Sequence, residues 1–298
     1  MNTLALGRVR IEAVVETAGP TRPTWLFPAA TPEALEPHRA WLAPHFIDAE
    51  GRLRQSVHTF VVKTPDLTVL VDTCIGNDKD RGGRRPFHML RTTFLEELRA
   101  GGVDPGDVDV VICTHLHVDH VGWNTRLADG RWVPTFPRAR YLFARREWEH
   151  WTSEEDDGTR RILADSVAPV LDAGLADLVE MDHRVSNEIW LEPTPGHTPG
   201  HVSVRLASDG TDAVITGDLM HHPVQVAEPA WQSAFDTDPV AARETRRAFC
   251  ARYADRPVTV LGTHFHHPTA GRIVSHRGAW RFVVAEPRSA RGTDGSPP

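Results

Sequence analysis

The sequence has little cysteine and tyrosine, and no long apolar run. Its three cysteines, Cys74, Cys113 and Cys250, are too few and too scattered for a disulfide framework or a cysteine-rich zinc site. No stretch approaches the roughly 20 apolar residues that a membrane-spanning helix needs. The start, MNTLALGRVRIEAVVETAG, lacks the apolar core and cleavage site of a signal peptide. We therefore expect a soluble cytoplasmic protein without membrane association.

An excess of basic charge is also absent. The 33 Lys and Arg residues against 40 Asp and Glu give a net charge of −7, which provides no electrostatic reason to expect a nucleic-acid partner. A chain of 298 residues, 40% of them hydrophobic, can bury a substantial core. We predict one domain over residues 1–284 and a disordered tail over residues 285–298. The sequence does not decide the oligomeric state and leaves a homodimer open.

Strand and helix patterns alternate along the chain. Short β-branched, apolar runs predict strands at residues 8–17, 56–64, 67–73, 108–113, 141–144, 189–194, 201–208, 213–218 and 258–264. Apolar residues at helical spacing predict helices at 32–42, 87–102, 146–154, 160–174 and 239–255. Residues 20–50, rich in proline and aromatic side chains, are expected to cover the domain as a lid. Strands followed by helices in both halves predict a layered α/β fold.

Histidine, by contrast, is abundant, with 17 residues. The block THLHVDH, which follows the predicted strand 108–113, contains His115, His117, Asp119 and His120. Burying these side chains together is unfavourable without a cation, and no hydrophobic core needs them. Imidazole and carboxylate groups suit zinc or another first-row metal ion. The block therefore predicts a metal site at this strand end.

Three further candidates each follow a later predicted strand: His197 in TPGHTPGH, Asp218 in ITGD and His264 in LGTH. Alone, each would more often be a turn residue, but beside THLHVDH they are candidate ligands, because loops after strands commonly carry functional residues. Other histidines stay open between supporting the ligands and lying at the surface: His201, His221, His222, His266 and His267.

The order of these motifs resembles the metallo-β-lactamase superfamily. The turn LVDTCIGND at 70–78 also resembles that family's Asp-Thr-Gly turn, with Cys74 where glycine is usual. The resemblance implies a four-layered αβ/βα sandwich with two metal ions at one edge, zinc first and iron, manganese or cobalt as alternatives. Carried over by motif, the first ion is held by His115, His117 and His197, the second by Asp119, His120 and His264, and Asp218 bridges both.

Within the superfamily, the sequence is most similar to the N-acyl-homoserine lactonase-like branch, whose members share this ligand set with a bridging aspartate. This resemblance implies a quorum-quenching type of hydrolase that opens lactones or related esters by a metal-bound hydroxide, with Asp119 passing a proton to the leaving alkoxide. Many of these lactonases carry a tyrosine three positions after the bridging aspartate. His221 stands there in this chain and is expected to replace the tyrosine as hydrogen-bond donor.

Several alternatives to lactone hydrolysis remain open at this point, among them the persulfide and thioester hydrolase branches of the superfamily. The same metal pair suits a phosphoester or organophosphate, and a non-catalytic metal-binding protein would belong to a different class altogether. Trp123, directly after the HVG sequence at 120–122, is expected to line the substrate pocket together with other aromatic and apolar side chains.

Overall fold

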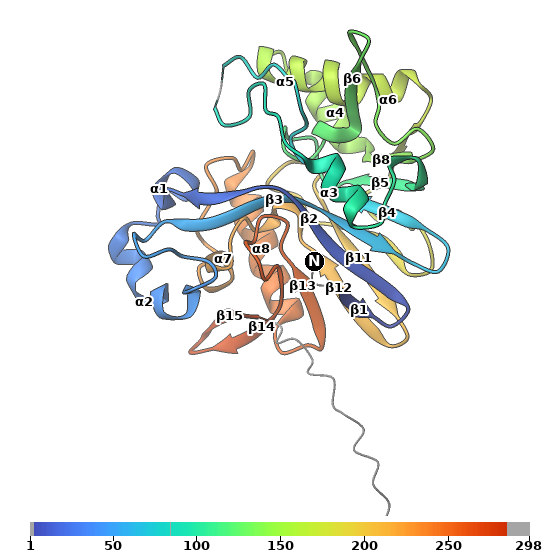
Figure 1. Cartoon of the computed structure of the whole chain (residues 1–298). Coiled ribbons are helices and arrows are strands. Elements are labelled where there is room, and N and C mark those ends of the chain that lie inside the picture. Colours follow the sequence, from blue (N-terminus) through green and yellow to red (C-terminus); the bar gives the residue numbers. More distant parts are fainter. Residues whose placement is uncertain (1–2, 84, 285–298) are drawn as a thin grey trace, which may run out of the picture.

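Two β-sheets face each other at the centre of the computed structural model, which describes residues 3–83 and 85–284 (Figure 1). The first sheet contains, in spatial order, β1 (Leu4–Leu6), β2 (Val9–Thr21), β3 (Leu53–Lys63), β4 (Thr68–Val71), β5 (Val110–Cys113), β8 (Arg140–Ala144) and β9 (Ala176–Val179). The second contains β10 (Ile189–Pro193), β11 (Val202–Ser208), β12 (Thr211–Ile215), β13 (Val258–Leu261), β14 (Ala270–His276) and β15 (Ala279–Val284). A separate hairpin pairs β6 (Thr125–Ala128) with β7 (Arg131–Pro134).

Helices cover the outer faces of both sheets. On the first sheet lie α3 (Phe94–Ala100), α4 (Arg145–Ser153), α5 (Asp157–Ile162) and α6 (Ala168–Asp172), the last two joined by a π-helical turn at Leu163–Val167. On the second lie α1 (Pro23–Leu26), α2 (Pro32–Leu42), α7 (Val224–Ala227) and α8 (Pro239–Tyr253). Within the described residues, no helix combines the length and apolarity needed to cross a membrane.

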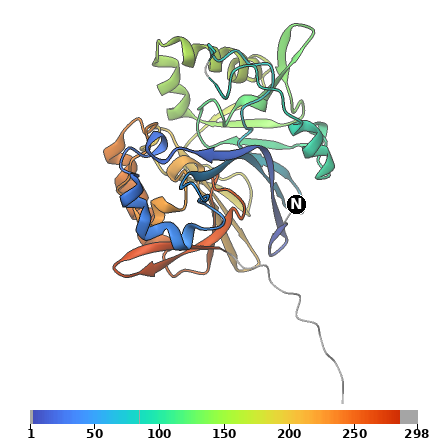
Figure 2. The same cartoon turned by 60° about the vertical axis from the view of Figure 1, so that its left-hand side comes forward.

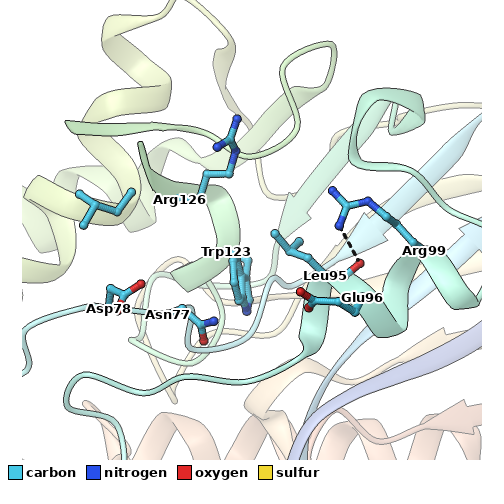
Figure 3. A pocket seen from close by; sticks show the side chains of 8 residues that line it. Asn77, Asp78, Leu95, Glu96, Arg99, Trp123 and Arg126 are labelled. Carbon is cyan, nitrogen blue, oxygen red and sulfur yellow. Dashed lines mark hydrogen bonds between the residues drawn. The ribbon is translucent and has the colours of Figure 1, made fainter. Parts of the chain in front are cut away.

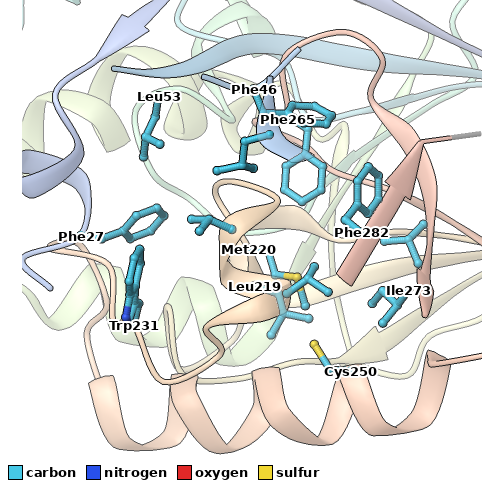
Figure 4. Close-up of a cluster of buried hydrophobic side chains, with 14 of the residues drawn as sticks. Phe27, Phe46, Leu53, Leu219, Met220, Trp231, Cys250, Phe265, Ile273 and Phe282 are labelled. Carbon is cyan, nitrogen blue, oxygen red and sulfur yellow. The ribbon is translucent and has the colours of Figure 1, made fainter. Parts of the chain in front are cut away.

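Three apolar clusters hold these layers together. Between the sheets, side chains such as Phe60 and Ile112 pack against Val204 and Ile215. A second cluster joins the first sheet to α3 and α6, and the third joins the second sheet to α8, α2 and α7 (Figure 4). Each sheet is therefore buried on both faces over much of its area, which gives the four-layered αβ/βα sandwich expected from the resemblance.

The segment 20–50 packs into the third cluster. Thr31 caps α2 by accepting a hydrogen bond from Ala34 N at 3.2 Å, and Leu35 and Leu42 point from this helix into the cluster. Phe46 packs against Phe282 of β15 with ring centroids 6.0 Å apart. Figure 2 shows this segment, in blue, lying against the orange and red elements of the second half.

Several predicted elements differ in extent from the observed ones. The predicted helix 87–102 forms only at Phe94–Ala100, because the segment before it pairs with residues 78–79 instead: Met89 N donates to Lys79 O at 2.8 Å, and Asp78 N donates to Leu90 O at 3.0 Å. The predicted helix 160–174 is divided by the π-helical turn. Strands β1, β6, β7, β9, β14 and β15 were not predicted. The predicted tail, 285–298, lies outside the described residues.

Candidate metal centre

Four loops that follow strands meet at one edge of the sandwich. Strand β5 ends at Cys113, β10 at Pro193, β12 at Ile215 and β13 at Leu261, and the loop after each carries candidate ligands. Strand β5 runs parallel to β4, and β12 runs parallel to β13, so the carboxyl ends of each pair lie side by side. The predicted strands 213–218 and 258–264 stop earlier than expected, which leaves Asp218 in a short 3₁₀ turn at Gly217–Leu219 and His264 in a loop.

All seven predicted ligands lie in two adjacent clusters. Within each cluster, the donor atoms lie within 4.8 Å of one another. The first cluster contains His115, His117, His197 and Asp218, and the second contains Asp119, His120 and His264. The six residues other than Asp218 fall into the two sets that the family motif implies, and Asp218, which the motif assigns to both ions, groups with the first set.

The nitrogens of the first cluster face one another at close range. His117 Nδ1 lies 3.0 Å from His115 Nε2 and 2.9 Å from His197 Nε2. In the second cluster, His264 Nε2 lies 3.3 Å from His120 Nε2. Converging imidazole nitrogens with a carboxylate among them form a donor set that suits zinc and related first-row ions.

Asp218 lies between the two clusters. Its Oδ2 is 3.4 Å from His197 Nε2 and 3.4 Å from His120 Nε2, and its Oδ1 is 3.1 Å from His264 Nε2. The carboxylate is buried, and its Oδ1 has no hydrogen-bond donor among the described residues. A buried oxygen without a donor, surrounded by imidazoles, fits a bridging position between two cations.

The electrostatics of the cluster indicate that it needs positive charge. Burial opposes protonation of His120 and His264, but nearby carboxylates, Asp218 foremost, raise the pKa of His120 well above its usual value and that of His264 to about 9. Burial also disfavours charge on Asp218, yet the surrounding imidazoles, His120 first, hold its pKa well below the usual range. Burial lowers the pKa of His115 and His197. These shifts mean that the folded centre favours positive charge around the Asp218 carboxylate.

Residues 52–264 match the family model described as metallo-beta-lactamase superfamily. This range covers more than half of the chain and includes all seven clustered residues. The chain belongs to the metallo-β-lactamase superfamily.

Several relatives within this superfamily are N-acyl homoserine lactonases. The one from Bacillus sp is 30% identical over 221 residues, which cover 69% of this chain and 80% of the relative. The lactonase AttM from Azorhizobium caulinodans is 35% identical over 126 residues, but the match spans only 39% of this chain and 43% of that protein.

Solved structures share the fold at lower sequence identity. The hydrolase AbOPH of the beta lactamase superfamily is 24% identical, with a TM-score of 0.79 over 96% of this chain and 98% of that one. AidC, described as a dizinc quorum-quenching lactonase in complex with a product, is 18% identical, with a TM-score of 0.76 over 97% and 98% of the two chains.

In three of the clustered histidines, the ring nitrogen that faces away from the other ligands lies near an oxygen atom, as in many metal sites. His197 Nδ1 lies 3.0 Å from Asp236 Oδ1, His120 Nδ1 lies 3.0 Å from Asp72 Oδ2, and His264 Nδ1 lies 3.1 Å from Ser56 O. Asp72 belongs to the recognised turn motif but was given no role from the sequence. Asp236 carried no sequence signal, because it is 39 positions away from His197 and lies in an irregular loop.

Two of the undecided histidines have structural roles near the centre. His201 Nε2 accepts a hydrogen bond from the backbone N–H of Asp218 at 2.8 Å. Burial lowers the pKa of His201 to about 3, so the ring stays neutral and remains an acceptor. His222 Nε2 lies 2.7 Å from Phe46 O and ties the 20–50 segment to the loop after Asp218. His266 lies 3.2 Å from an Arg54 nitrogen, outside both ligand sets.

His221 lies inside the centre but belongs to neither ligand set. Its Nε2 is 3.2 Å from Asp218 Oδ2, and its ring stacks over that of His264 with centroids 5.8 Å apart. Its backbone is fixed on both sides, because His221 N donates to Gln225 Oε1 at 2.8 Å and Gln55 Nε2 donates to His221 O at 3.0 Å. Its Nδ1 is buried without a hydrogen-bond partner among the described residues.

Trp123 lies behind the ligand loop. Its indole N–H donates to Glu16 Oε1 at 2.6 Å, and its ring stacks on Phe94. Trp123 lines a pocket of about 250 Å³ together with residues from α3 and the 77–78 turn (Figure 3). None of the candidate ligands is among the described residues that line this pocket, so it is separate from the candidate metal centre.

Proposed function

We propose that this superfamily member is a dinuclear metal-dependent hydrolase that opens lactones or related esters. The observation that carries the proposal is the position of Asp218, which is within 3.4 Å of imidazole nitrogens from both ligand sets. The lactonase names of several relatives support lactones as the substrate class. The partner is then a small molecule rather than a macromolecule.

The proximity of the clustered side chains supports two ligand sets. His115, His117 and His197 would hold one ion, Asp119, His120 and His264 the other, and Asp218 both. Two bound cations, zinc first with iron, manganese or cobalt as alternatives, would polarise a carbonyl and lower the pKa of water.

Two side chains are proposed as catalytic residues. Asp119 has a side chain that is 17% exposed, against 4% for Asp218, and this partial access suits a carboxylate that passes a proton to a leaving alkoxide. His221 is proposed to donate a hydrogen bond to the substrate. Its fixed backbone and its place beside Asp218 support a pre-positioned donor.

Metal analysis combined with a substrate panel tests this proposal. The purified protein should carry close to two first-row metal ions and hydrolyse acyl-homoserine lactones or simple lactones faster than paraoxon-type triesters or aryl phosphodiesters. Preference for a phosphorus ester would show that the proposed substrate class is wrong, but it would leave the proposed metal centre unaffected. Two bound ions without activity on any of these substrates would favour a non-catalytic metal-binding protein, and a protein that binds no metal would refute the proposal.

A further inference from the structure

The two loops that carry the first ligand set come from different sheets. Residues 114–121 follow β5 of the first sheet, and residues 194–201 follow β10 of the second. One backbone hydrogen bond joins their bases, from Val202 N to Thr114 O at 3.0 Å. A further connection is needed to fix the tips of the loops, where the histidines lie.

Glu147 of α4 makes that connection. Its Oε1 accepts a hydrogen bond from Leu116 N at 3.1 Å, between His115 and His117 in the first loop. Its Oε2 accepts one from Gly200 N at 2.9 Å in the second loop. The side chain is only 1% exposed and touches both loops at their backbones.

The same carboxylate also holds an aromatic side chain against a candidate ligand. Trp151 Nε1 donates to Glu147 Oε1 at 2.5 Å, and the Trp151 ring meets the His117 ring edge-on with centroids 5.1 Å apart. Glu147 therefore acts on His117 twice, through the loop backbone and through the neighbouring indole.

Gly200 shows how closely α4 and the second loop approach. A Cβ atom at Gly200 would lie 2.2 Å from Glu147 N and 2.5 Å from Glu147 Cα, a separation that backbone atoms cannot relieve without moving. The second glycine of the TPGHTPGH motif, Gly200, is thus required by this contact. The loop has no room to shift toward the helix.

We propose that Glu147 is a positioning residue for the metal centre, whose carboxylate fixes the two loops relative to each other so that His115, His117 and His197 converge on one ion. The inference rests on the metal centre proposed above. A carboxylate is required because three N–H groups point at it and it offers only acceptors. A glutamine in its place would turn its own NH₂ group toward Gly200 N–H or toward Leu116 N–H and Trp151, whichever way the amide lies.

Metal titration of the Glu147→Gln variant tests this role without reference to activity. Zinc affinity, measured by chelator competition on metal-free protein, should fall by about 10- to 100-fold, as for other residues that orient metal ligands. The visible spectrum of the cobalt-substituted protein should also change, because the ligand geometry around one ion is disturbed. Asp165→Asn is the matched control, since Asp165 is a buried carboxylate paired with Arg81 and should leave both readouts unchanged.

Wild-type zinc affinity together with an unchanged cobalt spectrum in Glu147→Gln would overturn the inference. If that variant does not fold, Trp151→Phe replaces it. This change removes one donor to Glu147 but keeps an aromatic ring beside His117, and it should weaken zinc binding in the same direction by a smaller factor. Unaltered zinc binding in Trp151→Phe would then count against the role. A wild-type protein without metal would instead refute the proposed function itself.

Discussion

Each clustered histidine uses its two ring nitrogens differently. In His197, Nε2 faces the other ligands while Nδ1 faces Asp236, and in His264, Nε2 faces the centre while Nδ1 faces the carbonyl of Ser56. A carbonyl can only accept, so His264 carries its neutral-state proton on Nδ1 and offers Nε2 as a ligand. In His117 the nitrogen that faces the other two histidines is Nδ1 instead of Nε2.

His221 provides a prediction at the residue scale. In His221→Ala, both metal ions should stay bound, because His221 belongs to neither ligand set, while kcat should fall by one or two orders of magnitude. That loss corresponds to about 1.4–2.7 kcal/mol of transition-state stabilisation from a single donor. Steady-state kinetics on the best lactone, combined with elemental analysis, measures both effects.

His276→Ala is the control for this experiment, because His276 ends β14, away from the centre, and should leave kcat unchanged. Full activity in His221→Ala would show that the donor role is absent. Loss of one metal ion would instead identify His221 as a ligand, through the nitrogen that now lies 3.2 Å from Asp218.

At the scale of elements, two loops behind the second ligand set pack backbone to backbone. Thr73 N donates to His120 O at 2.7 Å, Gly122 N donates to Cys74 O at 2.8 Å, and Trp123 N donates to Thr73 O at 2.8 Å. Cys74 has a φ of 53°, which explains why a glycine is usual at this position of the motif.

Gly122→Ala should disrupt this packing. A Cβ atom there would lie 1.8 Å from Ile75 O, so one of the two loops must move. We expect the free energy of unfolding to fall by about 1–3 kcal/mol, a typical cost of overpacking, with weaker metal binding at His120. Urea unfolding followed by circular dichroism measures the first effect.

Gly19→Ala is the matched control, because no atom lies within 4 Å of a Cβ built there and its φ is not positive. It should leave stability unchanged or raise it by up to about 1 kcal/mol. Equal stability of the two variants would mean that the 73–76 turn can shift at little cost in free energy and does not support the centre.

The same scale shows what the sequence predicts well and what it does not. The helix 32–42 is observed at the predicted residues, because Thr31, Pro32 and the apolar spacing are all local signals. The helix expected from residue 87 is wrong in its first part, since pairing of Met89 and Leu90 with residues 78–79 outcompetes helical hydrogen bonds. Strands β14 and β15 were missed, because a hairpin containing Arg272, Arg281 and a Gly278 turn shows weak alternation.

The candidate site was more predictable than its surroundings. The seven clustered residues follow apolar strands within recognisable motifs, so their order along the chain was enough to select them. Asp236 and Glu147 could not be found this way, because their contacts with His197, Leu116 and Gly200 depend on tertiary packing alone.

At the scale of the whole molecule, the proposed ligands tie the two sheets together. His115, His117, Asp119 and His120 follow a strand of the first sheet, while the others follow strands of the second. Ions bound only to the folded state should stabilise it by about 2.7 kcal/mol at a concentration 100 times Kd. For a chain of 298 residues, that amounts to a Tm increase of about 4–5 °C.

Differential scanning calorimetry of metal-free and zinc-loaded protein checks this expectation. Asp218→Ala should abolish most of the increase, because the bridging carboxylate is lost, and its metal content and activity should fall together. Identical Tm values for the metal-free and zinc-loaded wild type would show that the ions, if bound, do not join the sheets.

The spread of the proposed ligands along the chain also has a consequence for biosynthesis. Ribosomes deliver the chain from its N-terminus, so His115, His117 and His120 emerge long before His197, and His264 comes after α8 and β13. An unfinished chain offers only a partial donor set, whose preference among divalent ions follows general affinity rather than geometry. The full set of proposed ligands, and with it any selection among metal ions by coordination geometry, is therefore available only after the last loop has been translated and folded.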